Sequence, residues 1–196
     1  RELSQRNLAR LRAGRGALHS ENWLWTSAFA LGFRELYWLP LPGRLPTAHR
    51  SGPLDLGTPA FYDSRRVEAE AALARLTAES IAPLAAAWSG ERLDGLVRAE
   101  VSVPVLTALD GPFIAAVLRR MVHEGWAAAR GLPDLLVLPG GEARVPDAVP
   151  GKLPNTAFFA EIKGPTDQVR DGQRRWHDQL LAAKIHVEIW DVSDMK

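Results

Sequence analysis

The sequence predicts a mixed α/β domain, and three observations lead to this class. The final third of the chain alternates short apolar runs with one amphipathic segment, as expected for strands over 135–138, 157–162 and 185–192 and a helix over 171–184. The first half instead carries apolar residues at helical spacing. At 196 residues, the chain is also long enough to bury a core of its own.

Composition excludes several classes of protein. The chain has no cysteine, which excludes disulfides and thiolate metal sites. No run approaches the roughly 18 apolar residues of a membrane span, so we expect no membrane partner. The net charge of +1 argues neither for nor against nucleic acid. Twenty basic residues are arginine and four are lysine, for which a GC-rich genome is the simpler explanation and phosphate recognition the alternative.

The first half is predicted to be helical, with a loop rich in proline and glycine near its middle. The first twenty residues hold five arginines against one glutamate, which favours a helix or a basic arm. A helix is expected from Ser20, a possible N-cap, to about Leu36. Three further helices are expected over 64–76, within 78–88 and over 111–130.

Two of the predicted strands carry charges in their apolar segments. Asp134 opens the strand at 135–138, and Glu161 and Lys163 lie at the end of the strand at 157–162. An unpaired buried charge is costly, so these residues need an explanation. Alternate residues of a strand share a face, so Glu161 and Lys163 point the same way. The Asp134 carboxylate lies beside them if the two strands pair.

Two adjacent carboxylates need a compensating partner. At about 4 Å they repel by roughly 4 kcal/mol at an effective dielectric constant near 20. Protonation, a cationic side chain or a divalent cation removes this repulsion. Oxygen ligands without cysteine or histidine favour Mg²⁺ or Mn²⁺ over zinc, and such a site can polarise a phosphoryl group. Lys163 would then position or deprotonate a water. Without further information, an ordinary surface Glu–Lys pair is the more common explanation of this pattern.

The same stretches resemble a nuclease family. The chain resembles the VRR-NUC branch of the PD-(D/E)xK nucleases in GLPDLLVL, AEIKGPTD, GQRRWHDQLLAA and VEIWDV. It further resembles the Fanconi-associated nucleases in HSENWLWTSAFALGFRELYW and PLDLGTPAFYDSRRVEAEAALARL. The resemblance covers most of His19 to Val192 and is poorest over 78–100.

This resemblance implies a fold and a domain organisation. The expected fold is a restriction-endonuclease-like PD-(D/E)xK core, a mixed sheet flanked by helices, over 111–196. A mainly helical part over 1–110 includes the helix that carries Glu21, and together they form one nuclease domain over 1–196. The chain begins at Arg1 rather than Met, so we expect it to be a fragment or a processed form of a larger protein. The resemblance implies that it is the C-terminal catalytic part of a bacterial relative of the family.

The resemblance also implies roles for individual residues. Glu21, Asp134 and Glu161 match the metal-binding carboxylates of the family, and the backbone carbonyl of Ile162 is expected to add a ligand. Lys163 matches the catalytic lysine. On the helix that follows, Gln173 matches a glutamine expected to contact the site or its water. The residues alone would favour a helix-dipole role for Glu21 and a surface position for the glutamine.

Four arginines are candidates for contact with DNA: Arg65, Arg130, Arg170 and Arg174. Three of them flank the site in sequence, and Arg65 lies in the SRR of the family stretch. For each, a solvated surface arginine is the alternative. Gly172 stands where relatives can carry a basic residue, so a 5′-phosphate pocket does not carry over directly from the family.

The function implied is a Mg²⁺- or Mn²⁺-dependent DNA phosphodiesterase, a 5′ flap endonuclease or 5′–3′ exonuclease of interstrand-crosslink repair. Its expected partners are branched or 5′-flap DNA and upstream SAP-type and helical-repeat regions of the same protein, which are not recognisable in this sequence. Such a protein would lie in a bacterial cytoplasm or nucleoid, or in a eukaryotic nucleus. One alternative is a dimeric VRR-NUC Holliday junction resolvase, which the Glu21 helix and PLDLGTPAF disfavour. The other is a DNA-binding module that is inactive without its upstream region.

Overall fold

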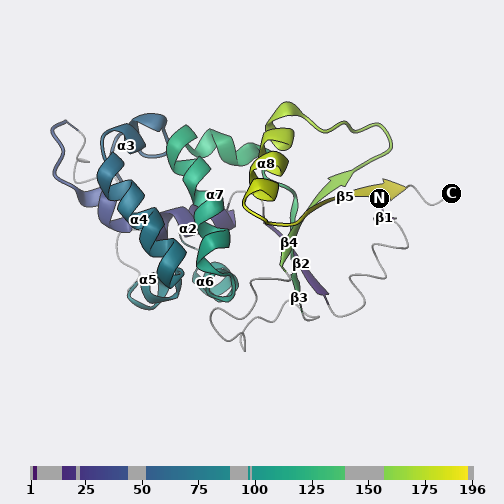
Figure 1. Ribbon diagram of the computed structural model, residues 1–196, viewed down its shortest axis with the longest axis horizontal. Helices are drawn as coiled ribbons and strands as arrows, with labels where there is room; N and C mark the ends of the chain where they lie inside the picture. The colour runs from purple at the N-terminus through teal and green to yellow at the C-terminus, as the bar shows by residue number, and fades with distance from the viewer. Residues whose placement is uncertain are drawn as a thin grey trace.

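A computed structural model shows a helical half beside a sheet that carries one helix of its own (Figure 1). This architecture confirms the predicted mixed α/β class with a sheet flanked by helices. The structure describes residues 2–3, 15–20, 23–43, 52–88, 97, 99–139 and 157–193.

The helical half is built around α7, the amphipathic helix predicted from sequence. Asp110 caps its N-terminus by accepting a hydrogen bond from the backbone N–H of Phe113 at 2.8 Å. Gly111 lets the first turn approach the end of α4, because a Cβ there would collide with the carbonyl oxygen of Leu76. The helices of this half are α2 (Trp23–Gly32), η1 (Arg34–Trp38), α3 (Pro59–Asp63), α4 (Arg66–Glu79), α5 (Ala82–Ala86), α6 (Ala99–Ala108), α7 (Gly111–Glu124) and η2 (Trp126–Gly131).

The sheet has five strands in the order β1-β5-β4-β3-β2. Strands β4 and β5 are parallel and are connected through α8, whereas the other neighbouring pairs are antiparallel. The elements are β1 (Glu2–Leu3), β2 (Arg15–His19), β3 (Leu135–Pro139), β4 (Phe158–Lys163), α8 (Asp171–Ala182) and β5 (Val187–Ser193).

The N-terminal segment differs from the expected helix or basic arm where the structure describes it. Residues 15–19 form β2 and pair with β3, so that Ala17 lies opposite Val137 and Leu18 opposite Leu136. A strand of this kind depends on a partner far away in sequence, which a local helical or charge pattern does not reveal. The pairing brings the N-terminal part of the chain into the sheet.

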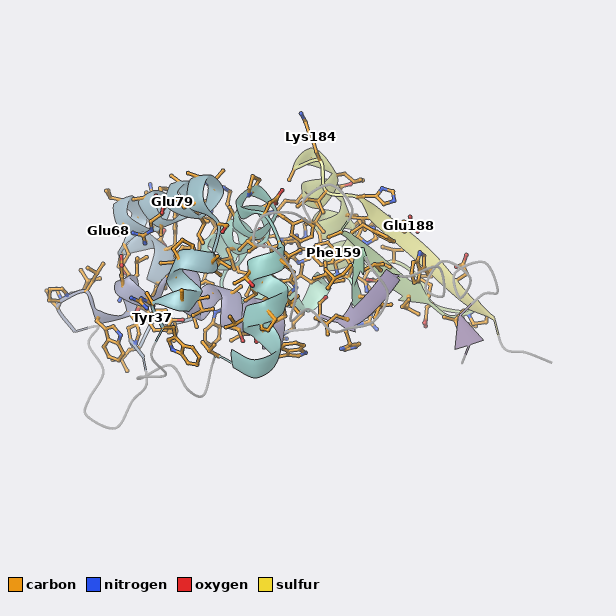
Figure 2. All side chains as sticks on the ribbon, turned by 90° about the horizontal axis from the view of Figure 1, so that it is seen from below. Tyr37, Glu68, Glu79, Phe159, Lys184 and Glu188 are labelled. Carbon is orange, nitrogen blue, oxygen red and sulfur yellow. The ribbon has the colours of Figure 1, made fainter. Side chains whose placement is uncertain are left out.

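The two faces of the sheet have separate apolar clusters. Leu136 and Phe159 point toward the helices, where the Phe159 ring lies 5.7 Å from that of Trp25 and 5.3 Å from that of Phe113 (Figure 2). Val137, Phe158, Ala160 and Trp190 form a smaller cluster on the other face. Because side chains alternate along a strand, Glu161 and Lys163 lie on the same face as Phe159, toward the helices.

A buried ion pair joins the loop before α3 to the start of α4. The Arg65 side chain is fully enclosed, and its Nη1 lies 2.8 Å from Oδ2 of Asp55. Its Nε donates to the carbonyl of Leu36, and its guanidinium lies over the ring of Phe61. The prediction that Arg65 contacts DNA is therefore wrong: all these contacts turn its charge into the protein interior.

No single helix in the described ranges is long and apolar enough to cross a membrane. Ser102–Ala108 and Gly111–Glu124 meet the length and composition of a span only as a pair, and they are bent by 117° relative to one another. Many side chains of this pair lie in the core, including Leu106, Ile114 and Leu118.

Candidate active site

The ends of β3 and β4 bring two carboxylates together. Leu136 pairs with Phe159, so the antiparallel register, continued by two residues, places Asp134 opposite Glu161. Asp134 Oδ2 accepts a hydrogen bond from the backbone N–H of Ile162 at 2.8 Å. The predicted pairing of these two strands therefore brings Asp134 next to the end of β4 that carries Glu161.

Glu161, Lys163 and Gln173 form a closed hydrogen-bonded cluster. Lys163 Nζ lies 2.8 Å from Oε1 of Glu161 and 3.0 Å from Oε1 of Gln173. The Gln173 amide nitrogen donates to the same Glu161 oxygen. Glu161 is 1% exposed and Lys163 is 8% exposed. Burial is compatible with these two charges because they pair with each other and with a polar amide.

Gln173 also holds the start of its own helix. Its side-chain oxygen accepts a hydrogen bond from the backbone N–H of Arg170 at 2.9 Å, which satisfies one donor at the N-terminus of α8. One amide therefore contacts the helix end, Lys163 and Glu161. The surface position that the residues alone would favour for Gln173 is not what the structure shows.

The turn after β4 fixes the direction in which the chain leaves Lys163. Gly164 N–H donates to the Asp167 carboxylate at 3.0 Å, and Asp167 N–H donates back to the Gly164 carbonyl at 3.1 Å. This reciprocal turn ends the strand directly after the lysine. The chain then reaches α8 within a few residues, which returns Gln173 to the lysine.

The helix η2 seats α8 against the helical half. Gly131 touches the first turn of α8, since a Cβ on Gly131 would lie only 2.7 Å from the Gly172 carbonyl group. Trp176 is fully buried and donates its indole N–H to the carbonyl of Ala128 at 2.7 Å. Because η2 ends shortly before Asp134, these contacts set α8 and the strand ends relative to each other.

The chain segment that leads to Glu21 lies beside Asp134. Ser20 is buried, its N–H donates to the carbonyl of Asp134 at 3.1 Å, and its hydroxyl lies 3.4 Å from the carbonyl oxygen of Pro133. Glu21 itself lies outside the described residues, so its role as a metal ligand stays a prediction.

The described donor set suits a hard cation. Asp134 and Glu161 offer carboxylate oxygens, and the Ile162 peptide lies against the first of them. Among the residues that the structure describes, no three His, Cys, Asp or Glu side chains form a group that could hold a metal ion. A ligand set built on these residues thus needs Glu21 or the Ile162 carbonyl to complete it.

His177 lies one turn beyond Gln173 on α8, near the lysine. Burial lowers its pKa most, the positive charge of Lys163 lowers it further, and Asp178 partly opposes both. The net lowering favours a neutral imidazole beside the cluster at neutral pH.

An arginine-rich pocket of about 390 Å³ opens beside the cluster, between the end of α7, η2 and the start of α8. Two of the arginines predicted to contact DNA, Arg130 and Arg170, line it, whereas Arg174 is exposed outside it, with its Nε near the carbonyl of Val169. The charged and amide side chains that line this arginine pocket are Arg120, Arg130, Arg170, Arg175, Glu124 and Gln173.

Sequence reasoning missed Arg120. It is 5% exposed, and its guanidinium lies 4.5 Å from the centre of the Trp176 ring. The available signal was its position in α7, three residues after Val117 and one before Met121, inside the apolar stripe. An arginine at such a position must find a partner inside the protein.

Comparison with known proteins now places the chain in a family. The VRR-NUC domain model matches residues 68–194. The chain belongs to the VRR-NUC domain family. The match begins well before residue 111, where the core was predicted to start, and the predicted division at 110/111 stays a prediction.

Named relatives of this VRR-NUC chain are Fanconi-associated nucleases, as the resemblance indicated. The Fanconi-associated nuclease 1 homolog of Oryza sativa subsp. japonica is 29% identical over 191 residues, which are 89% of this chain and 18% of that protein. Fanconi-associated nuclease 1 of Ailuropoda melanoleuca is 28% identical over 188 residues, 89% of this chain and 17% of that protein. The chain thus spans less than a fifth of these relatives.

Solved structures share the mixed sheet flanked by helices that was predicted for this VRR-NUC chain, which is consistent with a PD-(D/E)xK-like fold. A crystal structure of paFAN1 bound to 2nt 5′-flap DNA with a gap aligns with a TM-score of 0.68 at 22% identity. The alignment covers 99% of this chain and 36% of that chain. A second paFAN1 structure, with a 1nt 5′ flap, aligns with a TM-score of 0.66.

Proposed function

We propose that this chain is the catalytic part of a metal-dependent, structure-specific DNA nuclease that cuts 5′ flaps or trims 5′ ends during interstrand-crosslink repair. The observation that carries the proposal is the cluster of Glu161, Lys163 and Gln173 beside Asp134. VRR-NUC membership and relatives named as nucleases support it.

The residues that would hold Mg²⁺ or Mn²⁺ are Asp134, Glu161, Glu21 and the carbonyl of Ile162. Such a cation, when bound, would polarise the scissile phosphate and favour attack by water. Lys163 places a buried positive charge where negative charge develops on the phosphate. Through its hydrogen bonds to both partners, Gln173 keeps the lysine and Glu161 in place before DNA arrives.

The arginine pocket is the proposed contact with the DNA backbone. It is lined by four arginines against one glutamate and includes Gln173, so phosphates bound there would lie next to the catalytic cluster. We propose Arg130 and Arg170 as phosphate contacts from the edges of this pocket and Arg174 as a more peripheral one. The flap DNA bound in the paFAN1 structures supports branched DNA as the substrate class.

Substrate selection is proposed to need upstream parts of the protein, including SAP-type and helical-repeat regions. The chain spans less than a fifth of the length of these relatives, which supports a role for regions outside it. For a nuclease of this kind the expected location is the cytoplasm or nucleoid of a bacterium, or the nucleus of a eukaryote.

A cleavage assay tests the proposed activity. End-labelled 5′-flap, single-stranded and four-way-junction DNA are incubated with the chain and Mg²⁺, Mn²⁺ or EDTA. We expect metal-dependent cuts near the flap junction and none with EDTA. Symmetric cuts in the four-way junction would instead support the resolvase alternative, and binding without cuts would support a module that needs its upstream regions.

Gln173→Met tests the role of the Gln173 side-chain amide, which contacts Glu161 and Lys163. Methionine fills a similar volume but cannot donate to Glu161 or accept from Lys163, so we expect kcat to fall about 10- to 100-fold. Gln179→Met is the matched control, because Gln179 lies on the same helix and bonds to the Ala116 carbonyl away from the cluster. Equal activity of the two variants would contradict the role assigned to Gln173.

A further inference from the structure

One carboxylate side chain lies among the arginines of the arginine pocket. Glu124 lines the pocket, and its two carboxylate oxygens lie 3.2 and 3.3 Å from Nε of Arg120, one turn earlier on α7. The other charged residues that line the pocket are all arginines. A carboxylate at this position fills part of the space that a phosphate would take. It also neutralises part of the positive charge that would attract the phosphate.

Arg120 differs from the other pocket arginines because it is enclosed. Its side chain is 5% exposed and its guanidinium is stacked on Trp176, so its position is fixed before any ligand binds. Its Nη1 is buried and has no hydrogen-bond partner among the residues that the structure describes. A buried guanidinium N–H without an acceptor is costly, and an anion in the pocket would supply one.

Glu124 can leave this contact more easily than Arg120 can. Its side chain is 51% exposed, and a carboxylate this exposed is weakly held by a residue four positions away on the same helix. A phosphate matches the guanidinium fork as a carboxylate does. A terminal 5′-phosphate also offers three acceptor oxygens and up to two negative charges, whereas an internal phosphodiester has two non-bridging oxygens and one charge and is held by further contacts along the DNA strand.

We propose that Arg120 is a phosphate-binding residue at the floor of the arginine pocket and that Glu124 is its built-in competitor, displaced when a phosphate of the DNA strand enters. The inference rests on the proposed function, because it assumes that DNA is the ligand. It assigns a function to two residues that neither the motif nor the predicted arginines included.

Glu124→Gln is the most direct test of this competition. Binding is measured by fluorescence anisotropy with labelled 5′-flap DNA in EDTA, at about 0.15 M salt, where charges more than about 8 Å apart are largely screened. We expect the variant to bind with a Kd roughly two- to fivefold lower than the wild type.

Glu68→Gln is the matched control for this measurement. It changes the net charge by the same amount, and Glu68 is exposed on α4 in the helical half, at a distance from α8 (Figure 2). We expect its Kd to change less than about 1.5-fold. Equal changes in the two variants, or no change in either, would overturn the role of Glu124.

Arg120→Lys tests the other partner. Lysine keeps the charge but loses the planar fork and the stacking on Trp176, so binding should weaken by about tenfold or more and Glu124→Gln should no longer improve it. The melting temperature shows whether Arg120→Lys folds. If it does not fold, the comparison of Glu124→Gln with Glu68→Gln still tests the proposal, because both substitutions are at exposed side chains. Flaps with a 5′-phosphate or a 5′-hydroxyl then distinguish a terminal from an internal phosphate as the ligand.

The binding assay separates this inference from the proposed function. If the wild type cuts flap DNA with metal but Glu124→Gln binds DNA no more tightly than Glu68→Gln, the proposed nuclease activity stands. Only the proposed competition between Glu124 and phosphate is then contradicted. A chain that neither cuts nor binds DNA would instead remove the proposed function on which the inference rests.

Discussion

Asp134→Asn and Glu161→Gln are each expected to reduce DNA cleavage by at least about 100-fold. Both substitutions keep the shape of the side chain and remove its negative charge. Asparagine can still accept the hydrogen bond from Ile162 N–H, and glutamine can still accept one from Lys163. The loss would therefore report the missing charge rather than a collapsed site.

Asp167→Asn is the matched control for these two variants. Its carboxylate also accepts a backbone hydrogen bond, from Gly164, but it lies in the exposed turn after β4. Cleavage by this variant should remain close to that of the wild type, measured as initial rates on labelled flap DNA. Normal cleavage by both Asp134→Asn and Glu161→Gln would show that the carboxylates are not the reactive centre.

Asp55→Ala is expected to lower the free energy of unfolding by about 3–5 kcal/mol, because it leaves the buried Arg65 guanidinium without its carboxylate. For a chain of this size, that corresponds to a fall in Tm of roughly 6–20 °C. Asp63→Ala is the control: it breaks an ion pair with Arg66 that is 3.7 Å long and about two-thirds exposed, so Tm should hardly change. A similar Tm for both variants would contradict the structural role assigned to the buried pair.

The effect of Asp55 should also depend on pH. Burial alone would raise the pKa of Asp55, but hydrogen bonding and attraction by Arg65 outweigh it and the pKa is lowered. A lowered pKa gives stability that is present above the unfolded-state pKa of about 4 and is lost as the pH falls through the folded-state value. The difference in Tm between wild type and Asp55→Ala should therefore shrink under acidic conditions.

The core of the fold was predictable because its elements carry local signals. Strands β3, β4 and β5 are short apolar runs with clear ends, and α7 and α8 have strong helical periodicity. Strand β2 was not predictable in this way, because it depends on pairing with β3 more than a hundred residues later. Helix α6 contains Pro104 and has no distinct polar face, and it was not predicted either.

The site was predictable to the extent that it follows from strand alternation. That rule alone places Glu161 and Lys163 on one face, and the pairing of two apolar strands brings Asp134 to them. The position of Gln173 followed only from the resemblance, since its contacts depend on how α8 folds back. Arg65 and Arg120 were misjudged or missed because their partners, Asp55 and Trp176, are set by tertiary packing that the local sequence does not show.

The most direct measurement of the central claim is the melting temperature of the wild type and of Glu161→Gln, with and without Mn²⁺. If Asp134 and Glu161 hold a divalent cation, Mn²⁺ binds the folded wild type, relieves the repulsion between the carboxylates and raises its Tm. The same Mn²⁺ should leave the Tm of Glu161→Gln nearly unchanged. An unchanged wild type, or an equal rise in both proteins, would contradict the claim that these carboxylates form the metal site of a nuclease.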